Sequence, residues 1–170
     1  LPNVPIMTGT IFIGQDSLKQ NMIQHSFKNA KTAFIVNDGA YEELRYGFDI
    51  YNRYGVTLED QFDYEGVIEE SKKIIENENP QFMRIHFQGT GTAGYFDRDA
   101  GTNIWADDSK YRHEMQRADS VFGDFINWLK TTDRWNKTTM IVMGDHGQNN
   151  EGWHAPYIGQ SNKQPIFFTG

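Results

Sequence analysis

The sequence predicts an α/β fold: a three-layer helix-sheet-helix arrangement with a mostly parallel sheet. Short apolar runs, typical of buried strands, alternate along the chain with longer amphipathic segments, typical of helices. Parallel strands require long crossover connections, and helices between the strands supply them. Because no internal repeat or long linker interrupts residues 1–170, we expect a single domain.

The amino-terminal part of the chain predicts a loop, two helices and two strands. Prolines and glycines interrupt residues 1–14, which favours loop and turn. Apolar side chains at helical spacing predict a helix over 17–29. The apolar run 32–36 is followed by Asn-Asp-Gly, which predicts a buried strand. A short helix around 41–46 and a strand near 48–51 follow.

The middle of the chain holds the clearest helical periodicity. Residues 64–76 place apolar side chains on one face and charged side chains on the other, and Pro80 ends this helix. Residues 82–87 predict a strand, and the glycine- and threonine-rich segment 88–102 predicts a loop. Asp107, Asp108 and Ser109 can cap a long helix that continues to Leu129, with apolar residues every three or four positions.

The strongest chemical signal lies where an apolar run, 138–143, ends at a glycine. Asp145 and His146 follow side by side, and Pro165 leads into one more strand over 165–169. In open α/β sheets, ligands and catalytic groups lie at the carboxyl ends of buried strands. A carboxylate beside a neutral imidazole suits a divalent cation such as zinc or manganese. The alternative is that Asp145 caps a turn and His146 is merely exposed.

Composition excludes several other classes of protein. The chain has 16 Lys and Arg against 23 Asp and Glu, a net charge of -7, so electrostatic binding of a nucleic acid is not expected. It has no cysteine, so any metal must be held by oxygen and imidazole. Its apolar runs are too short to cross a bilayer, so we expect no transmembrane segment here.

Four stretches of the chain resemble the alkaline phosphatase superfamily, and they follow one another in the order that the family has. Met143–Gly147, Gly152–His154 and Gln164–Gly170 are similar to the end of its catalytic core, and Leu1–Gly9 resembles the stretch that follows its nucleophile. The nearest branches are the type I phosphodiesterases, the sulfatases and the phosphoethanolamine or phosphoglycerol transferases. The resemblance implies a metal-dependent hydrolase or transferase. Such an enzyme acts on phosphate or sulfate esters of small molecules, lipid head groups or glycans through a covalent intermediate.

The resemblance assigns roles to three residues. It implies that Asp145 and His146 bind the metal that activates the nucleophile, and zinc or manganese is expected there, with calcium or magnesium also compatible. His154 would contact the substrate or the metal, the alternative being a surface histidine in a glycine-rich loop. The nucleophile would fall immediately before Leu1, so we expect a catalytic core that is incomplete at both ends and has little activity by itself. The resemblance also implies an extracytoplasmic or periplasmic location.

One segment departs from the pattern of the family. Where two-metal members carry an Asp and a His for the second metal, this chain has Gly91 and Tyr95. One account is a single-metal enzyme, and another is a catalytically degenerate binding or structural domain. The third is a shifted register, in which Asp97 or Asp99 supplies a carboxylate instead of being a solvated loop acid. An unrelated doubly wound domain that ends a strand in Asp-His by chance is also consistent with the residues.

The remaining histidines and tryptophans carry weaker signals. His86 lies in an apolar strand and is expected to be a core histidine, whereas His25 and His113 are expected at the surface. Among the tryptophans, Trp128 fits helix packing, and Trp153 is the one we would place near a substrate.

Overall fold

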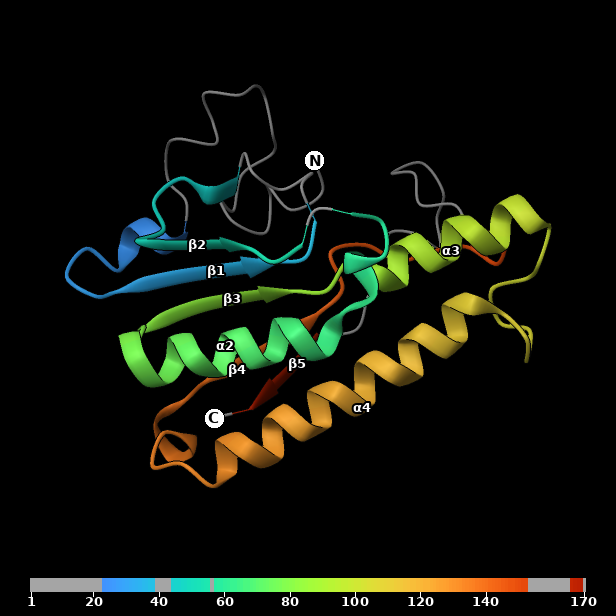
Figure 1. Cartoon of the computed structure of the whole chain (residues 1–170). Coiled ribbons are helices and arrows are strands. Elements are labelled where there is room, and N and C mark those ends of the chain that lie inside the picture. Colours follow the sequence, from blue (N-terminus) through green and yellow to red (C-terminus); the bar gives the residue numbers. More distant parts are fainter. Residues whose placement is uncertain (1–22, 39–43, 56, 153–165, 170) are drawn as a thin grey trace. The chain divides into compact units, whose positions relative to one another are not determined.

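A computed structural model of the chain describes residues 23–38, 44–55, 57–152 and 166–169 (Figure 1). It divides into two compact units, residues 1–88 and residues 89–170, which are described separately below. The loop expected over 1–14, the first half of the helix expected around 41–46, and His154 lie outside the described residues.

The first unit is built on a three-stranded parallel sheet of order β2-β1-β3. The central strand β1 (Thr32–Val36) pairs with β2 (Ile50–Arg53) and with β3 (Phe82–His86), and Ala33 lies opposite both Ile50 and Met83. The predicted parallel pairing and the strands expected at 32–36 and 82–87 are confirmed. The strand expected near 48–51 begins and ends two residues later.

The uninterrupted apolar run of β1 is explained by cover on both faces of the sheet. Ala33 and Ile35 pack against Val67 and other side chains of helix α2 (Tyr64–Glu78). On the opposite face, Phe34 packs against Leu44, Phe48 and Tyr51. Every side chain of β1 is therefore buried, as expected for the centre of a parallel sheet.

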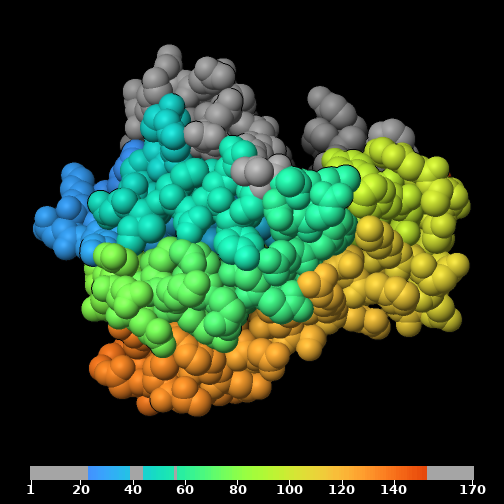
Figure 2. All heavy atoms as spheres, viewed as in Figure 1, coloured from blue at the N-terminus to red at the C-terminus, as the bar shows by residue number. Residues whose placement is uncertain are grey.

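Helix α2 confirms the amphipathic helix expected over 64–76 and extends it by two residues. The Asp63 carboxylate accepts a hydrogen bond from the Gly66 N–H (2.9 Å) and caps the amino end. Asn79, at φ 51°, ends the helix in the left-handed conformation just before Pro80. The outward face of α2 lies on the surface, as Figure 2 shows in green, so its charged side chains stay in water.

The helix expected over 17–29 is wrong in its described part. Residues Ile23–Ser26 form only a 3₁₀ turn, η2. Phe27 and Ala30 each continue the chain with a turn hydrogen bond to the carbonyl three residues earlier. The Phe27 ring stacks on the Phe82 ring of β3 with the centroids 4.8 Å apart. We attribute the difference to this contact, because it draws the chain toward the sheet and out of helical geometry.

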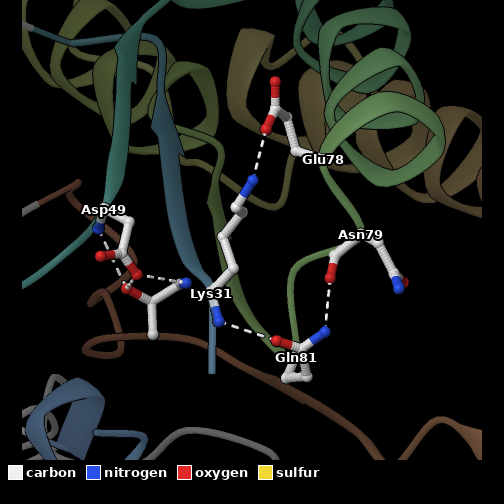
Figure 3. Close-up of polar contacts among 6 residues, drawn as sticks. Lys31, Asp49, Glu78, Asn79 and Gln81 are labelled. Atoms are coloured by element: carbon white, nitrogen blue, oxygen red, sulfur yellow. Dashed lines mark hydrogen bonds and ion pairs between the residues drawn. The ribbon is translucent and has the colours of Figure 1, made fainter. Parts of the chain in front are cut away.

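Polar side chains fix the point where the strands of the first unit begin (Figure 3). The Asp49 carboxylate accepts hydrogen bonds from the backbone N–H (2.8 Å) and the hydroxyl (2.9 Å) of Thr32. Lys31 donates its backbone N–H to the Gln81 side chain (2.7 Å) and pairs with Glu78 (2.6 Å). These contacts tie the start of β1 to the segments that lead into β2 and β3.

Asn37 performs the matching role at the carboxyl end of β1. Its side chain is fully buried and its amide nitrogen donates to the Gln61 carbonyl (2.8 Å), next to the short η4 helix (Asp60–Phe62). Its amide oxygen accepts from the Gln88 N–H (3.0 Å), just after β3. One side chain thus satisfies backbone groups from two connections at the edge where β1 and β3 end.

The second unit contains two helices and an antiparallel pair of strands. Helix α3 (Gly89–Ala100) is followed by α4 (Lys110–Lys130), the turn η5 (Trp135–Lys137) and strand β4 (Met140–Met143). The last strand, β5 (Ile166–Thr169), pairs with β4 in the antiparallel direction. No helix in the described part of the chain is long and apolar enough to cross a membrane.

Two features of the second unit correct the sequence-based expectations. The segment 88–102, expected as a loop, is helix α3 over most of its length. The β4–β5 pair is antiparallel, which is compatible with the predicted, mostly parallel arrangement. Strand β4 was expected to be buried, but Ile141 is 55% exposed. The long helix is confirmed, with Ser109 as its cap.

The Thr32–Asp49 contact predicts a pH dependence of stability. The backbone N–H and then the hydroxyl of Thr32 hold the pKa of Asp49 below its ordinary value. This stabilisation is present above pH about 4 and is lost as the pH falls through the lower pKa of the folded protein. In urea denaturation, the advantage of the natural chain over Asp49→Asn should therefore shrink on acidification. The same comparison with Asp119→Asn, an exposed residue of α4, should not change in this way.

The hydrogen bonds of Asn37 predict a large cost of removing its amide. Asn37→Ala leaves the partly buried Gln88 N–H and Gln61 carbonyl without this partner and should lower the free energy of unfolding by about 1 to 3 kcal/mol. Urea denaturation followed by circular dichroism measures the change. The matched variant Asn136→Ala, at an exposed position, should stay within about 0.5 kcal/mol of the natural chain. Equal effects of the two variants would contradict this role for Asn37.

Candidate functional site

Asp145 and His146 lie directly after β4, at its carboxyl end, as the strand–glycine pattern predicts. The Asp145 Oδ1 and His146 Nε2 atoms are 3.7 Å apart, so the two side chains face each other. Their side chains are 20% and 23% exposed. The pair is therefore mostly buried but still reachable from solvent, which differs from the alternative of a merely exposed histidine.

The contact of the His146 ring with Gly147 favours one tautomer of the imidazole. Its Nδ1 atom lies 2.9 Å from the carbonyl oxygen of Gly147. A carbonyl oxygen can only accept, so Nδ1 carries the proton and the lone pair of the neutral ring is on Nε2, the atom nearer to Asp145. This is the arrangement by which proteins commonly orient a histidine that binds a metal.

The geometry of the pair fits two ligands of one divalent cation. Two ligands of a tetrahedral zinc, each about 2.1 Å from the metal, lie about 3.4 Å apart, close to the 3.7 Å between Asp145 Oδ1 and His146 Nε2. In the described part of the chain, no group of three or more His, Asp or Glu side chains could hold a metal. The described residues therefore provide a partial set of ligands.

The loop that carries the pair packs closely against helix α3. Gly152 adopts φ +79°, and a Cβ atom there would overlap the backbone carbonyl of Gly94. A Cβ atom on Gly94 would in turn overlap the Gln148 side chain, whose amide donates to the Gly152 carbonyl (2.8 Å). Figure 1 shows this loop, in orange, running alongside α3. Two glycines thus allow the backbones of loop and helix to approach closely.

Tyr95 lies on α3 next to this contact. It occupies the position at which two-metal members of the family carry a histidine that binds the second metal. Burial raises the pKa of its hydroxyl, the charge of Arg98 lowers it, and the charge of Asp145 raises it. Tyr95 is therefore close enough to Asp145 for the two groups to interact electrostatically. The Arg98 guanidinium carbon lies 4.8 Å from the centre of the Tyr95 ring.

Asp97 and Asp99 behave differently from each other and from the loop acids expected in this segment. Asp97 is 5% exposed, and its two carboxylate oxygens accept from the backbone N–H groups of Lys110 (2.9 Å) and Tyr111 (2.8 Å). It therefore caps the amino end of α4 together with Ser109. Asp99 is exposed and pairs with Arg98 (2.7 Å). Sequence reasoning missed the role of Asp97, because its partners are 13 and 14 residues away.

The other histidines and tryptophans agree only in part with expectation, since His25 was expected at the surface and His86 in the core. His113 is exposed on α4, His25 and His86 are partly buried, and His86 Nε2 lies 3.3 Å from the Gln88 side-chain oxygen. Trp128 packs against Phe125 within α4 (centroids 5.7 Å apart). His154 and Trp153 lie outside the described residues, so their predicted proximity to a substrate stays a prediction.

Two solved structures resemble the fold of this chain. The first is a protein of the alkaline phosphatase superfamily from Vibrio parahaemolyticus, with a TM-score of 0.65 and 17% identity over 99% of this chain and 48% of that one. The second is the lipoteichoic acid synthase LtaP from Listeria monocytogenes, with a TM-score of 0.56 and 15% identity over 98% of this chain and 48% of that one. The fold is thus that of the alkaline phosphatase superfamily, and the chain spans about half the length of both proteins.

Sequence comparison gives the family within this fold. The family model described as Sulfatase matches residues 10–166. The chain therefore belongs to the sulfatase family, one of the branches that its motifs resemble. A comparison with curated protein sequences finds no match.

The capping role of Asp97 predicts that Asp97 and Asp99, two acids of α3, contribute differently to the free energy of unfolding. Asp97→Asn replaces one accepting oxygen with an amide group that cannot accept from a backbone N–H, and should lower the free energy of unfolding by about 1 to 2 kcal/mol. Asp99→Asn, which removes an exposed ion pair, should change it by less than about 0.5 kcal/mol. Thermal or urea denaturation measures both. If Asp97 instead supplied a metal ligand, its substitution would weaken metal binding more than it lowers stability.

Proposed function

We propose that this chain contributes the metal-binding part of a hydrolase or transferase that acts on phosphate or sulfate esters. The observation that carries the proposal is the facing pair of Asp145 Oδ1 and His146 Nε2 at the end of β4, with the ring fixed through Gly147. Membership of the sulfatase family and the superfamily fold support the class of reaction. The chemistry proceeds in this proposal through a covalent intermediate on a hydroxyl nucleophile.

The roles of the residues follow from their ligand chemistry. Asp145 and His146 hold the cation, for which zinc or manganese is the best match, while calcium or magnesium also suit the carboxylate. When bound, the cation lowers the pKa of the nucleophile and neutralises charge on the ester oxygens. His154, by resemblance to the family, contacts the substrate or the same cation.

We also propose a single cation for this site. Glycine at position 91 offers no side-chain ligand, and the protonated hydroxyl of Tyr95 is a poor one. The cap formed by Asp97 uses both of its oxygens, which argues against its serving as a substitute ligand. Since the family match runs over residues 10–166, across both compact units, we further propose that residues 1–170 work as one partial catalytic core.

The substrate is proposed only as a chemical class. One similar structure is a lipoteichoic acid synthase, which supports a transferase acting on the phosphate of a lipid head group. The sulfatase family match supports hydrolysis of sulfate esters of glycans or small molecules equally well. A second candidate function, a binding or structural domain without turnover, is favoured by Gly91 and Tyr95 at the second-metal positions.

Calorimetric titration with zinc and with manganese tests the metal site. The natural chain should bind one equivalent of metal, and Asp145→Asn or His146→Gln should weaken binding by at least about a hundredfold, because each removes a direct ligand. His113→Gln, an exposed histidine on α4, is the matched control and should bind as the natural chain does. Binding that is unchanged by Asp145→Asn would contradict the proposed site, and a second strong equivalent would contradict the single-cation proposal.

A further inference from the structure

Helix α3 presents two unlike side chains beside the proposed metal site. Positions 91, 95 and 98 are separated by four and three residues, so they form one stripe along the helix. The stripe begins with Gly91, which has no side chain, and continues with the Tyr95 phenol and the Arg98 guanidinium. A hydrogen-bond donor and a positive charge thus follow each other on one side of α3.

The contact between α3 and the loop after β4 places this stripe next to Asp145 and His146. A Cβ atom on Gly152 would lie 3.1 Å from the Cβ atom of Arg98 and would overlap the carbonyl of Gly94. The loop after β4 therefore contacts α3 at both ends of the turn that contains Tyr95. The electrostatic effect of Asp145 on Tyr95 agrees with this placement.

Arg98 forms an ion pair with Asp99 for which an anion can compete. Its Nε and Nη2 atoms contact a single oxygen of Asp99, at 2.8 and 2.7 Å. The Asp99 side chain is 66% exposed, so this ion pair is screened by water and contributes little. A guanidinium group has five N–H donors and remains charged at any physiological pH. An incoming dianion can therefore displace or share this contact.

The Tyr95 hydroxyl complements the charge of Arg98. A phenol hydroxyl has an ordinary pKa of about 10 and is protonated at neutral pH, so it can donate a hydrogen bond. The Arg98 guanidinium stacks over the same ring, which limits the positions that either side chain adopts. A donor hydroxyl and a guanidinium at adjacent positions suit a tetrahedral oxyanion, whose oxygens accept several hydrogen bonds at once.

We propose that Tyr95 and Arg98 form the oxyanion-binding part of the site and hold the sulfuryl or phosphoryl group beside the cation at Asp145 and His146. This inference rests on the proposed function, and it assigns to two named side chains the charge that a second metal would otherwise supply. Arg98 provides the positive charge, and Tyr95 provides a neutral donor. Neither residue takes up or releases a proton in this role.

Binding of inorganic sulfate and of inorganic phosphate tests the assignment. Each anion is titrated into the metal-loaded chain and into the chain with chelator, at constant ionic strength, and is followed by calorimetry or by NMR chemical shifts. Arg98→Gln keeps the aliphatic stem that contacts Gly152 and removes the charge. It should weaken binding of both anions roughly tenfold or more. Tyr95→Phe should weaken binding about three- to tenfold.

Two matched variants separate this role from general effects of charge and packing. Arg117→Gln removes an arginine of α4 that pairs with Glu114, and Tyr111→Phe removes the hydroxyl of a partly buried tyrosine in the same unit. Both should bind sulfate and phosphate as the natural chain does. The affinity for zinc should change less than twofold in Arg98→Gln, because Arg98 does not contact the metal.

The possible outcomes distinguish this inference from the proposed function. No binding of either anion by the natural chain, or equal losses in Arg98→Gln and Arg117→Gln, overturns the assignment. Equal losses of zinc and anion affinity in Arg98→Gln also overturn it, because they indicate a disturbed loop. If Asp145→Asn leaves zinc binding intact while Arg98→Gln still weakens anion binding, the metal assignment fails and the anion site stands. A preference for sulfate or phosphate in the natural chain indicates which ester it serves.

Discussion

The close approach of two backbones, at Gly94 and Gly152, is the constraint on which the candidate site depends. Side chains on these residues would force the loop after β4 away from α3, and Gly152 would also be strained at its positive φ. The contact brings the loop with Asp145 and His146 to the helix that carries Tyr95 and Arg98. Residues 50 positions apart in sequence thereby come within electrostatic reach of each other.

Helix α3 can serve as this support because it is itself fixed at its far end. Asp97 belongs to α3, yet its carboxylate caps α4 through the N–H groups of Lys110 and Tyr111. The buried Ile104 in the connection between the helices donates its N–H to the carbonyl of Asn150, in the loop after β4. The helix, the connection and the loop are thus joined by hydrogen bonds, which suits a site that must hold charged groups at fixed distances.

Sequence patterns predicted the parts of the fold that depend on local periodicity. Strand β1 and helix α2 follow from apolar runs and spacing, and the Asp-His pair lies at a strand end as the pattern indicated. Helix α3 was not predictable in this way, because glycine and threonine have low helix propensity and its helical form depends on contacts with α4 and the loop. The capping role of Asp97 and the proximity of Tyr95 to Asp145 are long-range consequences of the same packing.

The charge of the chain gives a further reason to expect a concentrated positive site. A net charge of -7 disfavours the approach of any anionic ester, so binding needs a local positive field that outweighs the distant negative charges. In our proposal, the cation at Asp145 and His146 and the guanidinium of Arg98 supply that field, and salt screens it least at short range. The acidic surroundings then disfavour anions elsewhere on the protein, and the productive position is set by two neighbouring positive groups and one neutral donor.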